Sequence, residues 1–482
     1  MIIDEQHWDD LENRMVQLND LRFRHHVGID IEPSEIEHHA QAVNALAETM
    51  APSYRQDPDA WSRLSGIIGQ ARLTPIELEI QRLNEQHFTF DDILLDGQPV
   101  TPYSRGQYLY RTDDPQKRHE ILSRILKGHP DVDQAWMRYH AKQSELAVEW
   151  EYSPLDDFLV AEGLDVTHLR NILMEMGIAM RPVFETLFAE NRDAVLGDNQ
   201  GEPWEDLRTL LFNRWSAYID RQVPAIDGVA TVSRVARKMG FAVDDIAMDL
   251  EDRPRKAPGA YAWAVRVPGD VRISIKATGN LSTLHVLYHE MGHALHFSSI
   301  DPDLPYYMRM GDFYGIIETF SFWLQSLLDD PLYLQEDLGL NERAVTEVAR
   351  FGLLTKALTL PVFSAQALCI LDYWTDGPLT LEQLDERHSH YLNQFTGLDI
   401  PVGAIRVLGI LLLHLDFNVV GYPIGYARLG YLLDQLETEQ RDWWHAPTAV
   451  DIVRNYMRGG RKAGFPASMS NVGAYVRRYV GS

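Results

Sequence analysis

The chain has 482 residues, 45% of them hydrophobic, so it can bury a large core in two or three domains or in one body with two lobes. Its formal net charge of −26 argues against nucleic acid or an anionic membrane as a partner, because both require a basic surface. The single Cys369 excludes an intrachain disulfide and a zinc site built from thiolates.

The start of the chain and its longest hydrophobic run indicate where in the cell the protein is expected. The first ten residues are acidic, unlike the start of a secretory signal. The longest hydrophobic run, 407–413, is much shorter than a membrane span. We therefore expect a cytoplasmic protein that contacts neither nucleic acid nor membrane.

The N-terminal part of the chain is expected to be helical, because its hydrophobic residues recur at helical spacing. A strongly periodic helix is predicted over 166–190. The polar, glycine-containing run 191–203 follows it and suits a boundary between lobes. The sequence thus predicts an N-terminal helical lobe over 1–200 and a second, catalytic lobe over 201–482.

A loop over 254–263 and a strand over 271–276 are predicted before the main motif. Hydrophobic and polar residues alternate in 271–276, which is typical of a half-buried strand. An exposed strand edge beside an active site can accept an extended peptide as an additional strand. The segment 271–276 is expected to be either such a peptide-binding edge or an ordinary edge strand under a loop.

The segment 281–299 carries the pattern His289-Glu290-x-x-His293. Residues four apart lie on the same face of a helix, so both imidazoles can bind one metal ion, at about 2.1 Å for zinc. Glu290 lies about 100° further round the helix. Its carboxylate can therefore reach a water on the metal without binding the metal itself. A chance match to this short pattern is the alternative.

The same helix carries two further histidines, His285 and His296. Four histidines are too many for one tetrahedral zinc ion that also binds a water. We therefore expect His285 and His296 to support the ligands or to belong to the core. The opposite face of the helix is hydrophobic, which predicts a helix that is buried on both sides.

A zinc site with two histidines still needs a third protein ligand. The best candidate is Glu318, which lies on a predicted helix over 316–328 but outside its hydrophobic face. A solvated carboxylate is the ordinary alternative for a glutamate on a helix. Asp312, Glu336 and Glu342 are the competing candidates for the third ligand.

After further helices, the segment 414–426 combines a histidine, two glycines and two tyrosines. Its residues of interest are His414, Gly421, Tyr422, Gly425 and Tyr426. The glycines would let the backbone bend close to a ligand. A tyrosine hydroxyl near a metal can donate to a developing oxyanion. Helix packing for the tyrosines and a core position for the histidine remain the alternatives.

Together these segments resemble the zinc oligopeptidases of the thimet oligopeptidase and oligoendopeptidase F group, and more closely the latter. The resemblance runs from about residue 103 to about residue 431. It rests on 256–263, on 283–296 with its His-Glu-x-Gly-His-x-x-His pattern, on Glu318-x-x-Ser321, and on His414 followed by the two tyrosines.

The resemblance implies a mostly α-helical, two-lobed fold of the zincin type. It also implies a small β-sheet beside the active-site helix and a deep substrate channel. Glu318 would be the third zinc ligand, and His414 and Tyr426, with Tyr422, would polarise the substrate. The sequence departs from the family at Gln325, where an acidic residue is usual, and at Pro423-Ile424, which interrupts the tyrosines.

The leading hypothesis is a metalloendopeptidase with one zinc ion per chain, held by His289, His293 and Glu318. It would hydrolyse internal bonds of short peptides through a zinc-bound water that Glu290 activates. One alternative is a metallocarboxypeptidase of the carboxypeptidase Taq type, which needs a cationic pocket for a C-terminal carboxylate. The other is a catalytically silent peptide-binding protein on the same scaffold, although a site without catalysis has no need of Glu290.

Overall fold

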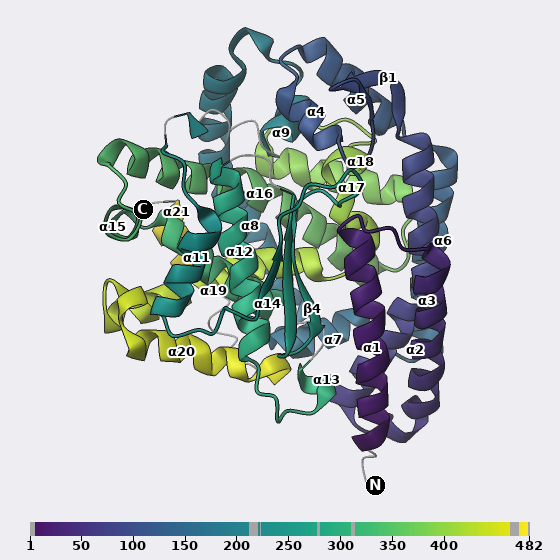
Figure 1. Cartoon of the computed structure of the whole chain (residues 1–482). Coiled ribbons are helices and arrows are strands. Elements are labelled where there is room, and N and C mark those ends of the chain that lie inside the picture. Colours follow the sequence, from purple (N-terminus) through teal and green to yellow (C-terminus); the bar gives the residue numbers. More distant parts are fainter. Residues whose placement is uncertain are drawn as a thin grey trace.

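The computed structural model describes residues 5–211, 220–221, 223–276, 280–309, 314–462 and 472–480. Helices dominate these residues, and the strands form one small sheet of two strands and one of three (Figure 1). The mostly α-helical fold with a small sheet beside the helix of the His-Glu-x-x-His pattern is therefore confirmed.

The N-terminal part consists of helices and one hairpin. Its elements are α1 (Glu5–His26), α2 (Pro33–Tyr54), α3 (Pro58–His87), β1 (Phe90–Leu95), β2 (Gln98–Val100), α4 (Arg105–Arg111), α5 (Pro115–Lys127), α6 (Pro130–Glu149), α7 (Pro154–Glu162), α8 (Val166–Asn191) and α9 (Pro203–Thr209). Many of these helices begin with proline, whose fixed φ and missing N–H suit the first turn. Helix α8 confirms the helix predicted over 166–190.

The C-terminal part adds the three-stranded sheet and the helices around it. Its elements are α11 (Gly228–Lys238), β3 (Ala247–Asp249), β4 (Ala260–Arg266), β5 (Asp270–Ile275), α12 (Asn280–Ser299), α13 (Tyr306–Arg309), α14 (Tyr314–Gln325), α15 (Pro331–Glu336), α16 (Glu342–Asp376), α17 (Leu381–Thr396), α18 (Ile405–Leu408), α19 (Asn418–Glu439), α20 (Pro447–Arg458) and α21 (Val472–Tyr479). Helices α12 and α14 lie where the sequence predicts them.

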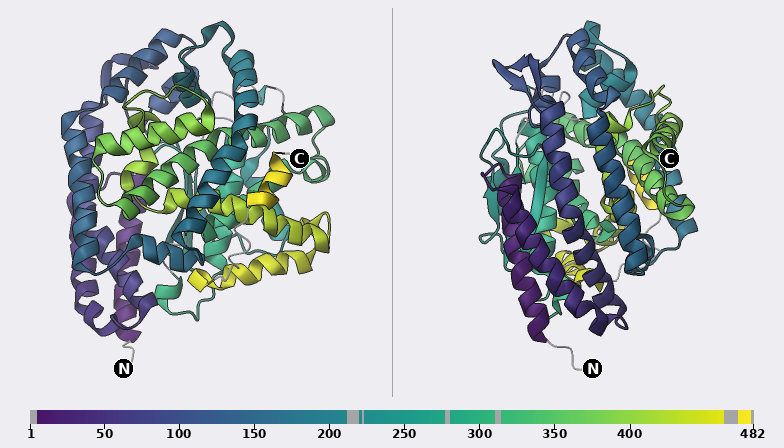
Figure 2. Two further views of the ribbon diagram at one scale, coloured as in Figure 1. Left: turned by 180° about the vertical axis from the view of Figure 1, so that it is seen from behind. Right: turned by 90° about the vertical axis from the view of Figure 1, so that its right-hand side faces the viewer.

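Two hydrophobic clusters form the core. The smaller one joins α1, α2 and the first part of α3 to α13, around fully buried side chains such as Leu11, Val43 and Leu64. These helices form one flank of the molecule together with α6 (Figures 1 and 2). The larger cluster contains the rest of the core, from Leu73 to Tyr475. The division into lobes at residue 200 stays a prediction.

The three-stranded sheet has the order β3-β5-β4, with β3 parallel and β4 antiparallel to β5. Because β5 is paired on both sides, the prediction that 271–276 is an edge strand is wrong. The three-residue strand β3 that covers its second side is too short to stand out in the sequence. The loop predicted over 254–263 is also wrong in its last part, since β4 begins at Ala260. Within the described part of the chain, no strand pairs with the outer edge of β4.

The two faces of this sheet are covered by different helices. Helix α12 packs against β4 and β5 on one face. On the other face, Arg272 of β5 forms an ion pair of 2.7 Å with Asp20 of α1 and lies 5.0 Å from the centre of the Phe23 ring. The ring of Trp263 on β4 lies 5.9 Å from the same ring. The sheet thus separates α12 from the N-terminal helix.

Helix α16 is the one described helix that is long and hydrophobic enough to cross a membrane, yet 78% of its most hydrophobic window is buried in the protein. It packs against α8, α17 and α19, so its composition is that of a core helix.

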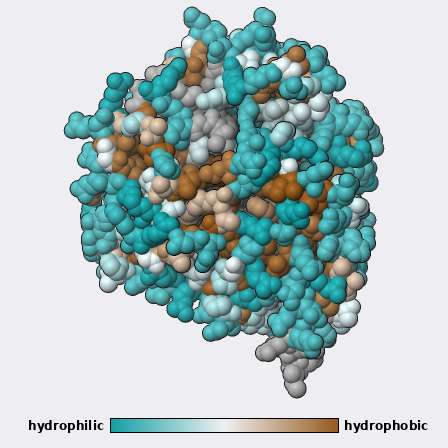
Figure 3. Space-filling model, in the orientation of Figure 1, coloured by the Kyte–Doolittle hydropathy of each residue, from teal (hydrophilic) through white to brown (hydrophobic). Residues whose placement is uncertain are grey.

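Figure 3 shows the surface of the face seen in Figure 1, with hydrophobic side chains gathered in the middle and a largely hydrophilic border around them.

Candidate metal centre

Helix α12 is fixed at its start by an acidic side chain from outside the helix. The carboxylate of Asp220 accepts hydrogen bonds from the backbone N–H groups of Asn280 and Leu281, at 2.8 and 2.7 Å. The first N–H groups of a helix have no partner within the helix and favour a negative charge. From this anchored end, α12 runs through the body with most of its later side chains buried and none exposed, as the sequence predicts.

The structure brings together the three predicted ligands. The Nε2 atoms of His289 and His293 lie 3.2 Å apart, and the carboxylate oxygens of Glu318 lie 3.5 Å from the first and 3.7 Å from the second. Ligand atoms of a tetrahedral zinc ion lie about 3.3 Å apart, given bonds of about 2.0 Å. The three groups therefore have the spacing of a metal site.

The rival third ligands are not part of this group. Asp312 lies outside the described residues. Glu336 and Glu342, at the end of α15 and the start of α16, do not belong to any described group of side chains that could hold a metal.

The donor set itself fits a cation. Burial raises the pKa of Glu318 well above its usual range and lowers the pKa of His289 to about 4. Two neutral imidazoles therefore face a carboxylate that has lost its water, and a divalent ion would compensate that loss. The amide oxygen of Gln325 lies 3.3 Å from Nδ1 of His289 and can accept its hydrogen. This tautomer leaves Nε2 of His289 as the ligand atom.

Two glycines allow the helix of Glu318 to lie close to its neighbours. A Cβ atom on Gly292 of α12 would lie 2.5 Å from the Cα atom of Ser321 on α14. A Cβ atom on Gly425 of α19 would lie 2.7 Å from the Cβ atom of Glu318 itself. Helix α14 is thus held between α12 and α19 at contacts that no larger residue permits, and these contacts place Glu318 opposite the histidines.

Gly292→Ala should therefore weaken both the fold and the metal site. The new methyl group meets backbone, so we expect a loss of about 1–3 kcal/mol in stability, less up to about 1 kcal/mol gained in helix propensity. Thermal unfolding and zinc affinity measure the two effects. Gly69→Ala in α3 is the control, because its new Cβ atom would meet nothing within 4 Å. This variant should be slightly more stable than the wild type. Unchanged zinc affinity in Gly292→Ala would contradict the proposed role of this contact.

Glu290 is buried beside the two histidines and faces the sheet. The backbone N–H of Ala262 on β4 hydrogen-bonds its carboxylate, while burial raises its pKa to about 8. No ion pair involves Glu290 among the described residues. Glu290 is thus a buried carboxylate beside the three candidate metal ligands, without being one of them.

The two tyrosines lie on a continuous helix, α19, so the glycine-rich bend predicted for this segment is wrong. The Tyr422 ring lies parallel to that of His289, with centroids 6.3 Å apart, and its pKa is raised by burial and then by the charges of Glu318 and Glu290. The Tyr426 ring is buried and stacks on Phe322 at 3.6 Å. Tyr422 thus lies beside the histidine while it also packs against Phe363 at 4.5 Å, and Tyr426 stacks on Phe322.

His414 lies apart from these residues. Its ring contacts those of Trp136 and Tyr139 on α6, at centroid distances of 4.9 and 6.1 Å. None of its described contacts reaches His289 or Glu318. The role predicted for His414 in polarising the substrate remains a prediction.

His285 and His296 belong to the core, one of the two positions expected from the sequence. His285 packs against Phe351 at 4.7 Å, and burial, followed by the charge of Lys356, lowers its pKa to about 3. His296 packs against Phe320 at 4.6 Å, and burial lowers its pKa to about 3 as well.

A cavity of about 670 Å³ lies between the N-terminal helices and the sheet. Its lining includes Trp263 of β4, His26 of α1 and His414. The His26 ring lies 4.3 Å from that of Tyr261, the residue beside Ala262 on β4. The cavity thus reaches the strand that holds Glu290. The sequence assigns no separate role to Tyr261, although Tyr261 and Trp263 are two residues apart and therefore share one face of β4.

No model of a known protein family matches the chain, and no curated protein matches it. Among solved structures, the molecule resembles Pz peptidase A, which was solved with an inhibitor. The match has a TM-score of 0.65 and covers 100% of this chain and 98% of that one. This chain shares the fold of that peptidase. At 11% sequence identity, the likeness to Pz peptidase A concerns the fold alone.

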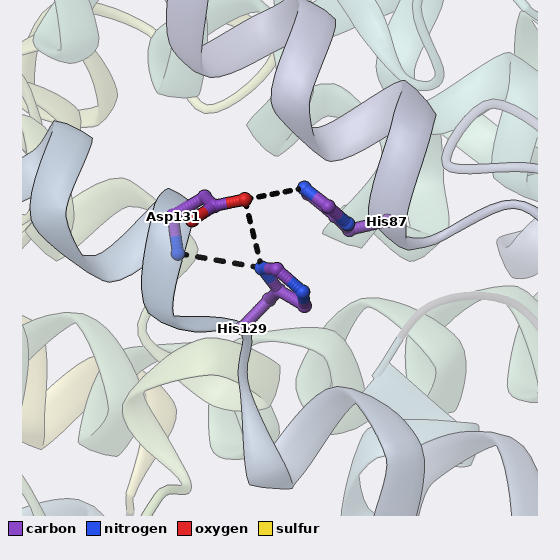
Figure 4. A group of neighbouring side chains, drawn as sticks. All are labelled: His87, His129 and Asp131. Carbon is purple, nitrogen blue, oxygen red and sulfur yellow. Dashed lines mark hydrogen bonds and ion pairs between the residues drawn. The ribbon is translucent and has the colours of Figure 1, made fainter.

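A second group of possible metal ligands consists of His87, His129 and Asp131 (Figure 4). Asp131 lies 3.1 Å from Nε2 of His87 and 3.7 Å from Nδ1 of His129. The two rings are stacked at 3.5 Å and only 13° from parallel. A nitrogen lone pair lies in the plane of its ring, so parallel rings cannot both point at one ion. His129 also accepts the N–H of Asp131 as the cap of α6, which gives this group a structural role.

Proposed function

We propose that this chain is a zinc-dependent metallopeptidase that hydrolyses internal bonds of short peptides. The observation that carries the proposal is the convergence of His289, His293 and Glu318, with Glu290 buried beside them. The shared fold with Pz peptidase A supports it. Gln325 in place of the family's acidic residue still offers an acceptor to His289, so the departure does not argue for a silent binding protein.

Each residue of the site has a proposed part. His289, His293 and Glu318 would hold one zinc ion, which would supply a Lewis acid for water and for the substrate carbonyl. Glu290 accepts the proton of the attacking water and returns it to the leaving amine. Its hydrogen bond from Ala262 holds this carboxylate at β4. A peptide that adds to the outer edge of β4 would bring its backbone to the same place.

A tyrosine hydroxyl should stabilise the oxyanion, and the contact with His289 favours Tyr422. We expect Tyr422→Phe to lower kcat by about 10²–10³-fold, as for the loss of one oxyanion donor, with little change in KM. Tyr426→Phe is the matched comparison, and its effect should be smaller because that ring packs against Phe322. Steady-state kinetics separate the two. A larger loss in Tyr426→Phe would restore the assignment made from the sequence.

The helix that carries His289 and His293 is buried in the body, so the substrate should reach the site as a single extended chain. Each ordered residue of such a chain loses about 1–2 kcal/mol of backbone entropy, so only a few subsites can contribute. The test is a digest of N-acetylated peptides of graded length beside a compact disulfide-bonded domain, read by mass spectrometry. We expect internal cleavage of the short peptides and no cleavage of the compact domain.

Two results of that digest would contradict the proposal. Efficient cleavage of the compact domain would indicate an open cleft. Strict release of single C-terminal residues would indicate the carboxypeptidase alternative instead. A parallel digest with the Glu290→Gln protein controls for contaminating peptidases.

A further inference from the structure

Helix α14, which carries Glu318, starts against a carboxylate from another part of the chain. The backbone N–H groups of Gly315 and Ile316, in the first turn of α14, donate to the carboxylate of Glu162, and the hydrogen bond from Gly315 is 2.9 Å long. The first N–H groups of a helix have no acceptor within it and favour a negative charge. Glu162 therefore holds the start of α14 as Asp220 holds the start of α12.

The carboxylate of Glu162 is itself held by Arg428 of α19. Nη1 of Arg428 lies 2.5 Å from a carboxylate oxygen of Glu162, and both side chains are fully buried. Nη2 of Arg428 donates at 3.1 Å to the backbone carbonyl of Glu162, which is the last residue of α7. The last carbonyls of a helix lack acceptors' partners within it and favour a positive charge. The pair thus joins the end of α7, the start of α14 and the middle of α19.

This joint lies one helical turn from the proposed metal ligand. Gly315 precedes Glu318 by three residues, which is about 4.5 Å along the axis of α14. On α19, Arg428 follows Gly425 by three residues, and a Cβ atom on Gly425 would lie 2.7 Å from the Cβ atom of Glu318. A Cβ atom on Gly315 would lie 2.9 Å from the carboxylate of Glu162. Helices α14 and α19 are therefore in close contact both at the ion pair and at Glu318, so a shift at the first contact moves the second.

Stability alone gives a weak reason for this pair. Burial raises the pKa of Glu162 above its usual range, although the charge of Arg428 and the hydrogen bond from Gly315 oppose the rise. The partners thus offset only part of the cost of burying the charge. Hydrophobic side chains of similar volume can often replace a buried ion pair without loss of stability. They cannot accept hydrogen bonds from the first turn of α14, so the main effect of the pair is expected on the placement of that helix.

We propose that Glu162, together with Arg428, is a positioning residue of the metal centre, which fixes the start of α14 and so places Glu318 opposite His289 and His293. This role rests on the proposed metallopeptidase function and deepens it, because it identifies residues outside the ligand set that determine zinc affinity. Glu162 acts through α14 and not by touching the ion. Without the pair, Glu318 is placed less firmly and zinc is bound more weakly.

The main variant combines Glu162→Leu with Arg428→Met, so that neither charge is left unpaired in the core. Competition with a chromophoric chelator measures the zinc affinity of the metal-free, full-length proteins. We expect this double variant to bind zinc about 10–100-fold more weakly than the wild type, as is typical when a residue that orients a ligand is lost. The visible absorption spectrum of the cobalt-substituted protein should also change, because it reports the arrangement of ligands around the ion.

The matched control combines Arg118→Met with Asp206→Leu. Arg118 of α5 and Asp206 of α9 form another fully buried ion pair, at 3.4 Å, and no described contact joins either residue to α12 or α14. Asp206 also pairs with Arg192, so this control should lose at least as much thermal stability as the main variant. It should nevertheless keep the zinc affinity and the cobalt spectrum of the wild type.

Glu162→Asp decides the question if the main variant does not fold. It keeps an opposite charge for Arg428, so the fold should be retained. It withdraws the carboxylate from the N–H groups of α14 by one methylene group. We expect its zinc affinity to fall by several-fold and its cobalt spectrum to differ from that of the wild type.

The outcomes separate this proposal from the proposed function. Wild-type zinc affinity and an unchanged cobalt spectrum in the Glu162 variants would overturn the positioning role and leave the peptidase standing. An equal loss of zinc affinity in the control would also overturn it, because lower stability alone would then explain the effect. Zinc binding by the wild type without peptide hydrolysis would contradict the peptidase, while a selective loss in the Glu162 variants would still support the positioning role. A wild-type protein that binds no zinc would contradict both.

Discussion

Glu290→Gln is expected to retain the fold and the bound zinc but to lose nearly all peptide hydrolysis. Glutamine has almost the same shape, yet it cannot accept a proton from the attacking water. Loss of a general base lowers the rate by about 10²–10⁴-fold, and more where the base also positions the water. Because Glu290 has no described ion pair, the change leaves no opposite charge unpaired. The measurements are kcat on a short peptide, zinc content and thermal unfolding.

The matched control for this variant is Glu336→Gln, an exposed glutamate at the end of α15. It should keep wild-type kcat, zinc content and stability. If Glu290→Gln retained activity within a few-fold of the wild type, the mechanism proposed for this site would be wrong. If it lost activity only because it lost zinc, Glu290 would support the metal site and not act as the base.

Glu318→Ala is expected to lose tightly bound zinc. The change removes one of the three proposed protein ligands. Loss of a residue that merely orients a ligand typically lowers metal affinity by about 10–100-fold, and the loss of zinc affinity here should be larger. It also removes a buried carboxylate that has no arginine or lysine partner among the described residues, so the fold should persist. Elemental analysis after dialysis against a weak chelator measures the effect.

Glu336→Ala tests the rival ligand in the same assay. It should keep one zinc ion per chain, because Glu336 belongs to no described group of metal ligands. Stoichiometric, tight zinc in Glu318→Ala would show that the third ligand is another residue. Loss of zinc in both variants would indicate a general effect on folding.

The parts of the site that the sequence predicts are those set by local geometry. The spacing of His289 and His293 needs only a helix to place both imidazoles on one side. Glu318 lies on the next long helix of the chain. Its position outside the hydrophobic face of that helix marks it as the candidate third ligand. The structure brings these three side chains together because Gly292 and Gly425 let their helices touch, which the hydrophobic periodicity does not reveal.

Other features depend on contacts between distant segments. The short β3 makes β5 a central strand, and so the outer edge of the sheet belongs to β4. Gly425 serves helix packing and not a bend. On the continuous helix α19, the ring of Tyr422 lies beside His289 and that of Tyr426 stacks on Phe322.

We propose that one zinc ion at this site makes the chain a peptidase. The most direct test of this claim is a titration of the chelator-treated protein with zinc, while hydrolysis of a mixture of N-acetylated peptides is followed by mass spectrometry. We predict no hydrolysis by the metal-free protein and a rise in internal cleavage that saturates at one zinc ion per chain. Hydrolysis that persists in the metal-free protein, or zinc binding that saturates without cleavage of any peptide, would contradict the claim.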